Sequence, residues 1–190
     1  MVRRFLRGQD EGPQLMRMSL GSPDAHSMLA LRSLFFTIAV PGTVVVLIPY
    51  LIVSREGASL RGPWTPLRAV SLVIIGVGAA ILVRCIWDFA AKGRGTLAPI
   101  DPPKQLVVQG LFRYVRNPMY LGVLVLLLGQ TAFFESIALL RYTGIWFAVV
   151  HLVVVLYEEP SLRRRFGAPY ERYCRSVHRW LPTRPIGRAA

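Results

Sequence analysis

Four long apolar segments constrain this chain more than any other feature of its sequence. They run from about Met28 to Val53, from Pro66 to Ala91, from Pro118 to Phe134 and from Ile137 to Tyr157. A helix crosses the bilayer core with roughly 20 residues, so the third segment is short and the other three are long enough. Hydrophobic residues form 53% of the chain, which exceeds the share of about 45–50% in soluble domains. We therefore predict an all-α, multi-pass membrane protein with about four transmembrane helices.

The segments predict one helical membrane domain over residues 28–182, whose motif region covers residues 93–182. Residues 1–27 are polar, are broken by Gly and Pro, and lack the apolar core of a signal peptide. We expect this arm to be flexible or interfacial. Residues 183–190 form a short tail.

The formal net charge of +13 comes almost entirely from arginine, and the arginines flank the apolar segments. This placement is typical of the positive flanks that orient membrane helices, and it argues against a nucleic-acid-binding module. The basic regions are the arm, the loop from Lys92 to Arg116 and the tail after Glu159. Four spans then place both termini in the cytoplasm, against anionic membrane lipids. The two cysteines and three histidines share no metal-ligand spacing, and no metal or disulfide is expected.

The region after Glu159 carries an amphipathic pattern. Its apolar residues recur every three or four positions, among many arginines. Gly167 and Pro169 are expected to divide it into two helices. Two interpretations remain open: an interfacial helix lying on the headgroups, or a lid over a site. The stripe consists of Leu162, Phe166, Tyr170, Tyr173, Val177 and Trp180.

A polar and aromatic cluster between Gly110 and Gly122 leads into the third apolar segment. It holds two arginines, one asparagine and two tyrosines. Such groups are costly at a membrane entry unless they bind something. The pair Glu158-Glu159 closes the fourth segment on the same predicted side. The sequence therefore predicts a site at the cytoplasmic membrane interface.

The order of the residues in these clusters resembles the isoprenylcysteine carboxyl methyltransferase family, which is related to the phospholipid N-methyltransferases. The resemblance covers roughly Gly93 to Pro182. It rests on Gly110, Tyr114, Arg116, Pro118, Tyr120, Gly122, Glu158, Glu159, Leu162, Phe166, Gly167, Tyr170 and Tyr173.

The resemblance implies S-adenosylmethionine as methyl donor and a lipid-like acceptor reached from the bilayer. That acceptor is either an isoprenylcysteine carboxylate or a phospholipid amine. The family usually has histidine where this chain has Asn117, which argues against proton transfer at that position. The eukaryotic carboxyl methyltransferases carry an arginine shortly before the glutamate pair, whereas Leu152 to Leu156 contains none.

Each part of this donor requires a different partner. A carboxylate suits its ammonium group or ribose, and only one of Glu158 and Glu159 is expected to face it, since adjacent helical residues point about 100° apart. An arginine fork suits its carboxylate. The expected catalytic residues are Arg116, Asn117 and Glu159. The expected donor-binding residues are Leu106, Val107, Gly110, Arg113, Asn117, Tyr120, Gly122, Glu158, Glu159 and Tyr173.

Acceptor binding is assigned to Arg84, Asp88 and Arg175. Structural alternatives stand beside the site assignments. Arg84 and Asp88 have the spacing of an internal ion pair, and Glu159 has that spacing to Arg163. Contact with lipid headgroups explains the arginines as well as donor binding does, and close packing of helices explains Gly122. The assignment of Leu106 and Val107 to an apolar slot for adenine rests on the resemblance alone.

Two other functions compete with a methyltransferase. An NADPH-dependent sterol or steroid-type reductase has a similar glycine and tyrosine series but favours an acidic residue where this chain has Val123. A non-catalytic membrane adaptor would leave the polar cluster without a purpose. The oligomeric state stays open.

Overall fold

The computed structural model describes residues 40–57, 63–92 and 110–183, of which 84% are helical and none lies in a strand. The α-helices are α2 (Ile48–Arg55), α3 (Pro66–Lys92), α4 (Pro118–Phe134), α5 (Ile137–Val153), α6 (Glu159–Phe166) and α7 (Ala168–Ser176). Shorter elements are the π-helices η1 (Thr43–Leu47) and η3 (Val154–Glu158) and the 3₁₀-helix η2 (Gly110–Arg113).

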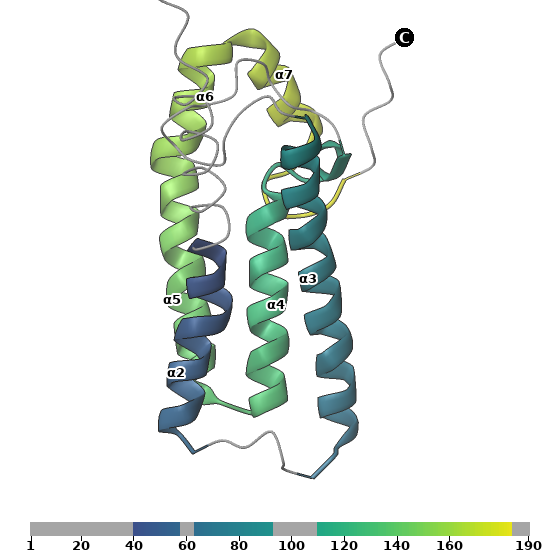
Figure 1. The fold of residues 1–190 in the computed structure, drawn as a ribbon. Coiled ribbons are helices and arrows are strands. Elements are labelled where there is room, and N and C mark those ends of the chain that lie inside the picture. Colours follow the sequence, from purple (N-terminus) through teal and green to yellow (C-terminus); the bar gives the residue numbers. More distant parts are fainter. Residues whose placement is uncertain (1–39, 58–62, 93–109, 184–190) are drawn as a thin grey trace, which may run out of the picture.

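The long helices stand side by side as a bundle (Figure 1). Helix α4 packs against both α3 and α5, and η1 and α2 lie against α4 and α5. Among the described residues, the helices Pro66–Asp88 and Ile137–Phe166 are long and apolar enough to cross a membrane, whereas Val40–Arg55 and Pro118–Phe134 are shorter. The prediction of a helical membrane protein is confirmed. Residues 28–39 of the first expected span lie outside the described residues.

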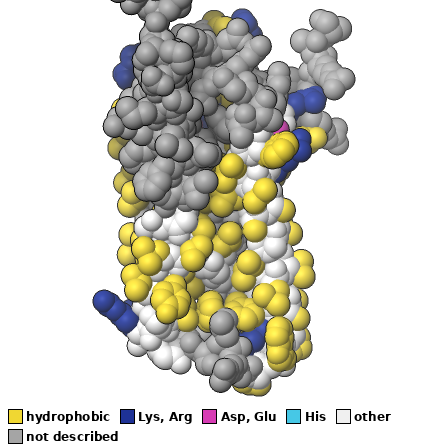
Figure 2. All heavy atoms as spheres, in the orientation of Figure 1, with side chains coloured by type: hydrophobic (Ala, Val, Ile, Leu, Met, Phe, Trp, Pro, Cys, Tyr) yellow, Lys and Arg dark blue, Asp and Glu magenta, His cyan; other side chains and the backbone are white. Residues whose placement is uncertain are grey.

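The outer surface of the bundle is apolar. Val73, Val83, Ile145 and Leu156 are each more than 60% exposed. Figure 2 shows hydrophobic side chains covering much of the visible lower face of the helices. Such an apolar surface is unfavourable in contact with water, and it is typical of helices that face the hydrocarbon core of a bilayer.

Glycines allow α3 and α4 to approach closely. A Cβ added to Gly78 would lie 2.5 Å from the backbone nitrogen of Leu126, and one on Gly122 would lie 3.1 Å from that of Leu82. Gly76, two residues earlier on α3 and therefore on a different face of the helix, has open space around it. Gly78 therefore lets the two helices pack in the manner of close helix pairs in membranes.

Pro49 explains the π-helical segment η1. Proline has no N–H for the carbonyl four residues earlier, and its ring crowds that carbonyl. The carbonyl concerned, that of Val45, accepts a hydrogen bond from the Gln130 amide at 2.8 Å. The neighbouring Val44 carbonyl accepts one from the Tyr142 hydroxyl at 3.0 Å. Side chains of α4 and α5 thus satisfy the carbonyls that a distorted membrane helix leaves open.

The same distortion occurs before Pro160. Here the Glu159 N–H donates to the Val154 carbonyl, five residues earlier, so that α5, η3 and α6 form one continuous helix with a single wide turn. A π-helical turn accommodates one more residue than an α-helical turn and changes which face later side chains occupy. This turn includes Glu158 and directly precedes Glu159.

The connection between α4 and α5 is a tight antiparallel hairpin. Glu135 ends α4 in the left-handed conformation, with φ at 50°. Ser136 then caps α5 by accepting a hydrogen bond from the Leu139 N–H at 3.0 Å. The Ser136 hydroxyl also contacts the Glu56 carboxylate after α2, which ties the hairpin to the first helix.

The C-terminal region divides at Gly167, as expected from the sequence. Gly167 has φ at +55° and separates α6 from α7. The apolar stripe turns toward the protein, because Tyr170, Tyr173 and Val177 are buried together, with Leu162 packed against them. Helix α7 therefore covers the end of the bundle (Figure 1). The last described residues, 177–183, are not helical; we call them the C-terminal strap.

Candidate active site at one end of the bundle

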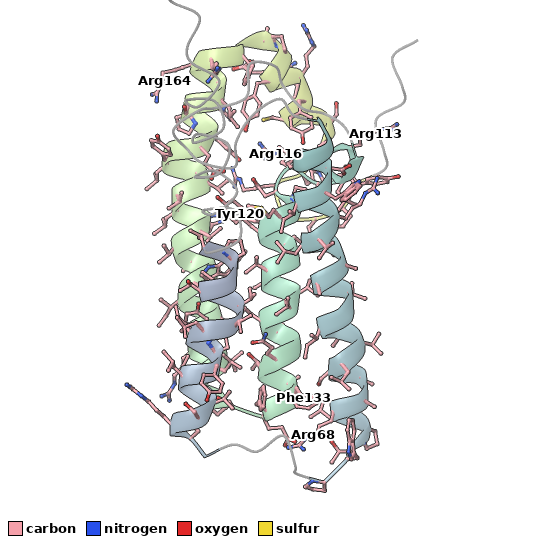
Figure 3. The ribbon with its side chains drawn as sticks, viewed as in Figure 1. Arg68, Arg113, Arg116, Tyr120, Phe133 and Arg164 are labelled. Atoms are coloured by element: carbon pink, nitrogen blue, oxygen red, sulfur yellow. The ribbon has the colours of Figure 1, made fainter. Side chains whose placement is uncertain are left out.

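The two polar clusters of the sequence meet at one end of the bundle. The Arg116 guanidinium, just before α4, lies 3.2 Å from the Glu159 carboxylate at the start of α6. One turn into α4, the Tyr120 hydroxyl donates to the Glu158 carboxylate at 2.5 Å. Figure 3 shows Arg116 and Tyr120 toward this end of the bundle and Arg113 at its outer edge. Residues about 40 positions apart in the sequence are thus in direct contact.

A second arginine completes the cluster around Glu159. Arg179, from the C-terminal strap, binds Glu159 through two guanidinium nitrogens, at 2.6 and 2.9 Å. The hydrogen bond to Glu159 raises the pKa of Arg179 above its usual value. The Glu159 residue is 6% exposed, and its carboxylate is held by Arg116 and Arg179 rather than by the anticipated Arg163. Two cations and one anion leave this cluster with a net charge of +1.

Glu158 has a different environment. Its partner, Tyr120, is a neutral phenol, so its charge is not compensated in the way that the charge of Glu159 is. Both members of the pair contact residues at the start of α4, although adjacent residues of a helix diverge. The wide turn of η3, which ends at Glu158, accompanies this arrangement.

Backbone contacts hold the C-terminal strap against the segment before α4. The Arg116 N–H donates to the His178 carbonyl at 3.0 Å, and the Thr183 N–H donates to the Tyr114 carbonyl at 2.7 Å. The Asn117 side-chain amide donates to the Arg179 carbonyl at 3.3 Å. Asn117 is therefore in the cluster, and it binds the strap.

The strap and Arg179 were missed as site components by sequence reasoning. In the sequence, Arg179 is one of many arginines around the amphipathic stripe. Because residues 177–183 are not helical, helical spacing carries no information about where Arg179 points. The available signal is Trp180, the last residue of the stripe, which directly follows Arg179 in the sequence.

Gly110, Asp88 and Arg84 form a neighbouring group at the end of α3. Gly110 has φ at +59°, and an added Cβ would overlap the Asp88 carboxylate. A glycine is therefore required here on two grounds. Arg84 and Asp88 form the ion pair that their spacing indicates, at 3.6 Å, with the Arg84 side chain 60% exposed.

The remaining predicted residues lie around this core. Tyr173 donates its hydroxyl to the Phe112 carbonyl at 2.7 Å, and burial raises its pKa, so it stays protonated. Arg175 is exposed and lines a shallow pocket of about 190 Å³ with Arg163, Glu171 and Cys174. Gly122 faces α3, where close helix packing accounts for it. Leu106 and Val107 lie outside the described residues.

One polar atom of the cluster lacks a partner. The Nε of Arg116 is buried and has no hydrogen-bond partner, while another nitrogen of the same guanidinium contacts Glu159 and the Cys174 sulfur, the latter at 2.9 Å. Buried donors are normally bonded, and an unbonded one in a cationic cluster suits an anionic ligand group. Within residues 40–57, 63–92 and 110–183, no His, Cys, Asp and Glu side chains form a group able to hold a metal ion.

Comparison with known proteins gives one match. The family profile described as phospholipid methyltransferase matches residues 67–169, which is more than half of the chain and includes α3, α4, the hairpin and the glutamate pair. Neither the curated proteins nor the solved structures gave a match. The chain therefore belongs to the phospholipid methyltransferase family and is a membrane methyltransferase.

Proposed function

We propose that the chain transfers a methyl group from S-adenosylmethionine to a lipid-like acceptor at the cytoplasmic membrane interface. The observation that carries this proposal is the convergence of Arg116, Asn117 and Tyr120 with Glu158 and Glu159 at one end of an apolar bundle. A lipid acceptor reaches such a site from the bilayer, and the donor reaches it from water.

Arg116 is the proposed partner of the donor carboxylate. Glu159 orients the guanidinium, and the cluster keeps a net positive charge after that pairing. The unpartnered Nε supplies a donor for an incoming carboxylate. These features support anion binding at Arg116, with Glu159 as the group that positions it.

Glu158 is the proposed partner of the cationic or hydroxyl-bearing part of the donor. Its carboxylate accepts from Tyr120 and retains lone pairs for a second donor. Glu159, held by two arginines, has less capacity for this. The proposal therefore divides the work of the pair, with Glu158 facing the ligand and Glu159 facing the arginines.

The donor, when bound, supplies an activated methyl group on a sulfonium. The protein contributes alignment of the acceptor with that methyl group and exclusion of water. A carboxylate acceptor needs no base, whereas an ammonium acceptor must first lose a proton. The position of Asn117 has no titratable group, so an amine acceptor would need another proton acceptor.

Calorimetric titration of the detergent-solubilised full chain tests this function. We expect S-adenosylhomocysteine to bind and NADPH not to bind. Arg116→Lys keeps the charge but removes the fork, and we expect at least tenfold weaker S-adenosylhomocysteine binding. Arg164→Lys, at an exposed position of α6, is the matched control and should bind as the wild type does.

Binding of NADPH, or an Arg116→Lys variant with unchanged affinity, would contradict the proposal. Methyl transfer to phosphatidylethanolamine, compared with transfer to a prenylcysteine analogue, then identifies the acceptor class. Transfer to neither, by a protein that binds the donor, would remove the proposed lipid acceptors and leave the donor assignment in place.

A further inference from the structure

We propose that His151 and Trp180 are positioning residues for donor binding, because their contact holds the C-terminal strap so that Arg179 reaches Glu159. This inference rests on the proposed function, since it assumes that the cluster around Glu159 binds the donor. His151 belongs to none of the sequence motifs discussed above, and Trp180 is the last residue of the amphipathic stripe.

The contact between them is specific. The Trp180 indole N–H donates to Nδ1 of His151 at 3.0 Å. This bond requires Nδ1 to be unprotonated, so the neutral ring carries its proton on Nε2. The indole also meets the Phe147 ring edge to face, with centroids 5.1 Å apart. Trp180 is thus attached to α5 by one hydrogen bond and one aromatic contact.

Arg179 and Trp180 are adjacent in the strap, yet they bind α6 and α5 on either side of η3. Their partners, Glu159 and His151, are eight residues apart. In an uninterrupted α-helix, such residues differ by about 80° around the axis. One extra residue in a wide turn subtracts about 100°, which leaves them within about 20° of one face.

The η3 distortion therefore makes it possible for two consecutive strap residues to bind the same helix face. Pro160 supplies the local cause of that distortion, since its ring and missing N–H disfavour the regular turn before it. The strap in turn carries the His178 carbonyl to the Arg116 N–H and the Arg179 carbonyl to Asn117. Loss of the Trp180 anchor would release these contacts as a group.

A double-mutant cycle on the full chain in detergent tests the proposal, with S-adenosylhomocysteine affinity as the readout. His151→Leu removes the acceptor, and Trp180→Phe removes the donor while keeping an aromatic ring against Phe147. We expect each variant to bind about five- to tenfold more weakly. The double variant should be no weaker than either single variant, because both remove the same contact.

His151→Asn provides the rescue, since its amide oxygen can replace Nδ1 as acceptor. We expect affinity within about twofold of the wild type. A residue with only a packing role would not distinguish Asn from Leu in this way. The ¹⁵N indole resonance of Trp180, assigned with Trp180→Phe, should shift in His151→Leu and return toward its wild-type position in His151→Asn.

The possible failures are distinguishable. If the wild type does not bind S-adenosylhomocysteine, the proposed function fails and the positioning role fails with it. If the wild type binds but the single variants bind equally well, or their effects add in the double variant, only the positioning role is overturned. An indole resonance that does not respond to His151→Leu would show that the hydrogen bond is not formed.

Discussion

Glu159→Gln is expected to weaken S-adenosylhomocysteine binding at least tenfold and to destabilise the protein. The substitution removes the carboxylate that contacts both Arg116 and Arg179. Breaking a buried ion pair from one side costs about 3 kcal/mol at the lower end of its range, and we use that end because the Arg179 side chain is 29% exposed. The expected fall in melting temperature is roughly 6–12 °C.

Glu171→Gln is the matched control for this prediction. Glu171 lies on α7 at the same end of the molecule and is exposed. The same change of charge there should leave both the melting temperature and the affinity near their wild-type values. A Glu159→Gln variant that binds and melts like the wild type would show that the arginine cluster neither orients the donor nor stabilises the fold.

Gly78→Ala is expected to lower the melting temperature by roughly 2–12 °C, since overpacking costs about 1–3 kcal/mol. The new methyl group would lie 2.5 Å from the Leu126 backbone nitrogen and 2.9 Å from the Gly122 carbonyl oxygen. Backbone atoms cannot rotate aside, so α3 and α4 would have to separate. Because α4 carries Tyr120, the Tyr120–Glu158 contact should weaken as well.

Gly76→Ala makes the same chemical change on the same helix. A Cβ at Gly76 has nothing within 4 Å, and alanine favours helix formation by up to about 1 kcal/mol over glycine. We expect an unchanged or slightly higher melting temperature. Equal losses in the two variants would mean that helix propensity, rather than the close approach of α3 and α4, sets the effect.

Much of the fold was predictable from local properties of the sequence. The hydrophobic segments predict the helices, and Gly167 predicts the division between α6 and α7. These features depend on neighbouring residues and on the cost of leaving a backbone polar group unpaired in lipid. The contact between Arg84 and Asp88 is local in the same sense.

The partners within the candidate site were less predictable. Helical spacing offered Arg163 as the partner of Glu159, whereas the structure uses Arg116 and Arg179, which are far from it in the sequence or beyond the last helix. His151 accepts a hydrogen bond from Trp180, and no spacing in the sequence relates these two residues. Helical periodicity does not predict where side chains lie in a non-helical segment such as the C-terminal strap. It also fails after a turn, such as η3, that contains an extra residue.

The sequence by itself determined that this chain is a helical membrane protein. It also determined that one polar cluster precedes the third apolar segment and another follows the fourth, on the same predicted side. Both results follow from hydrophobicity and helical periodicity, which are local properties of the sequence. Only the tertiary structure decided which carboxylate binds which arginine. That choice depends on the close approach of α3 and α4 at Gly78, on the wide turn before Pro160 and on the path of the C-terminal strap. Each of these features brings together residues whose separation in the sequence does not indicate that they are in contact.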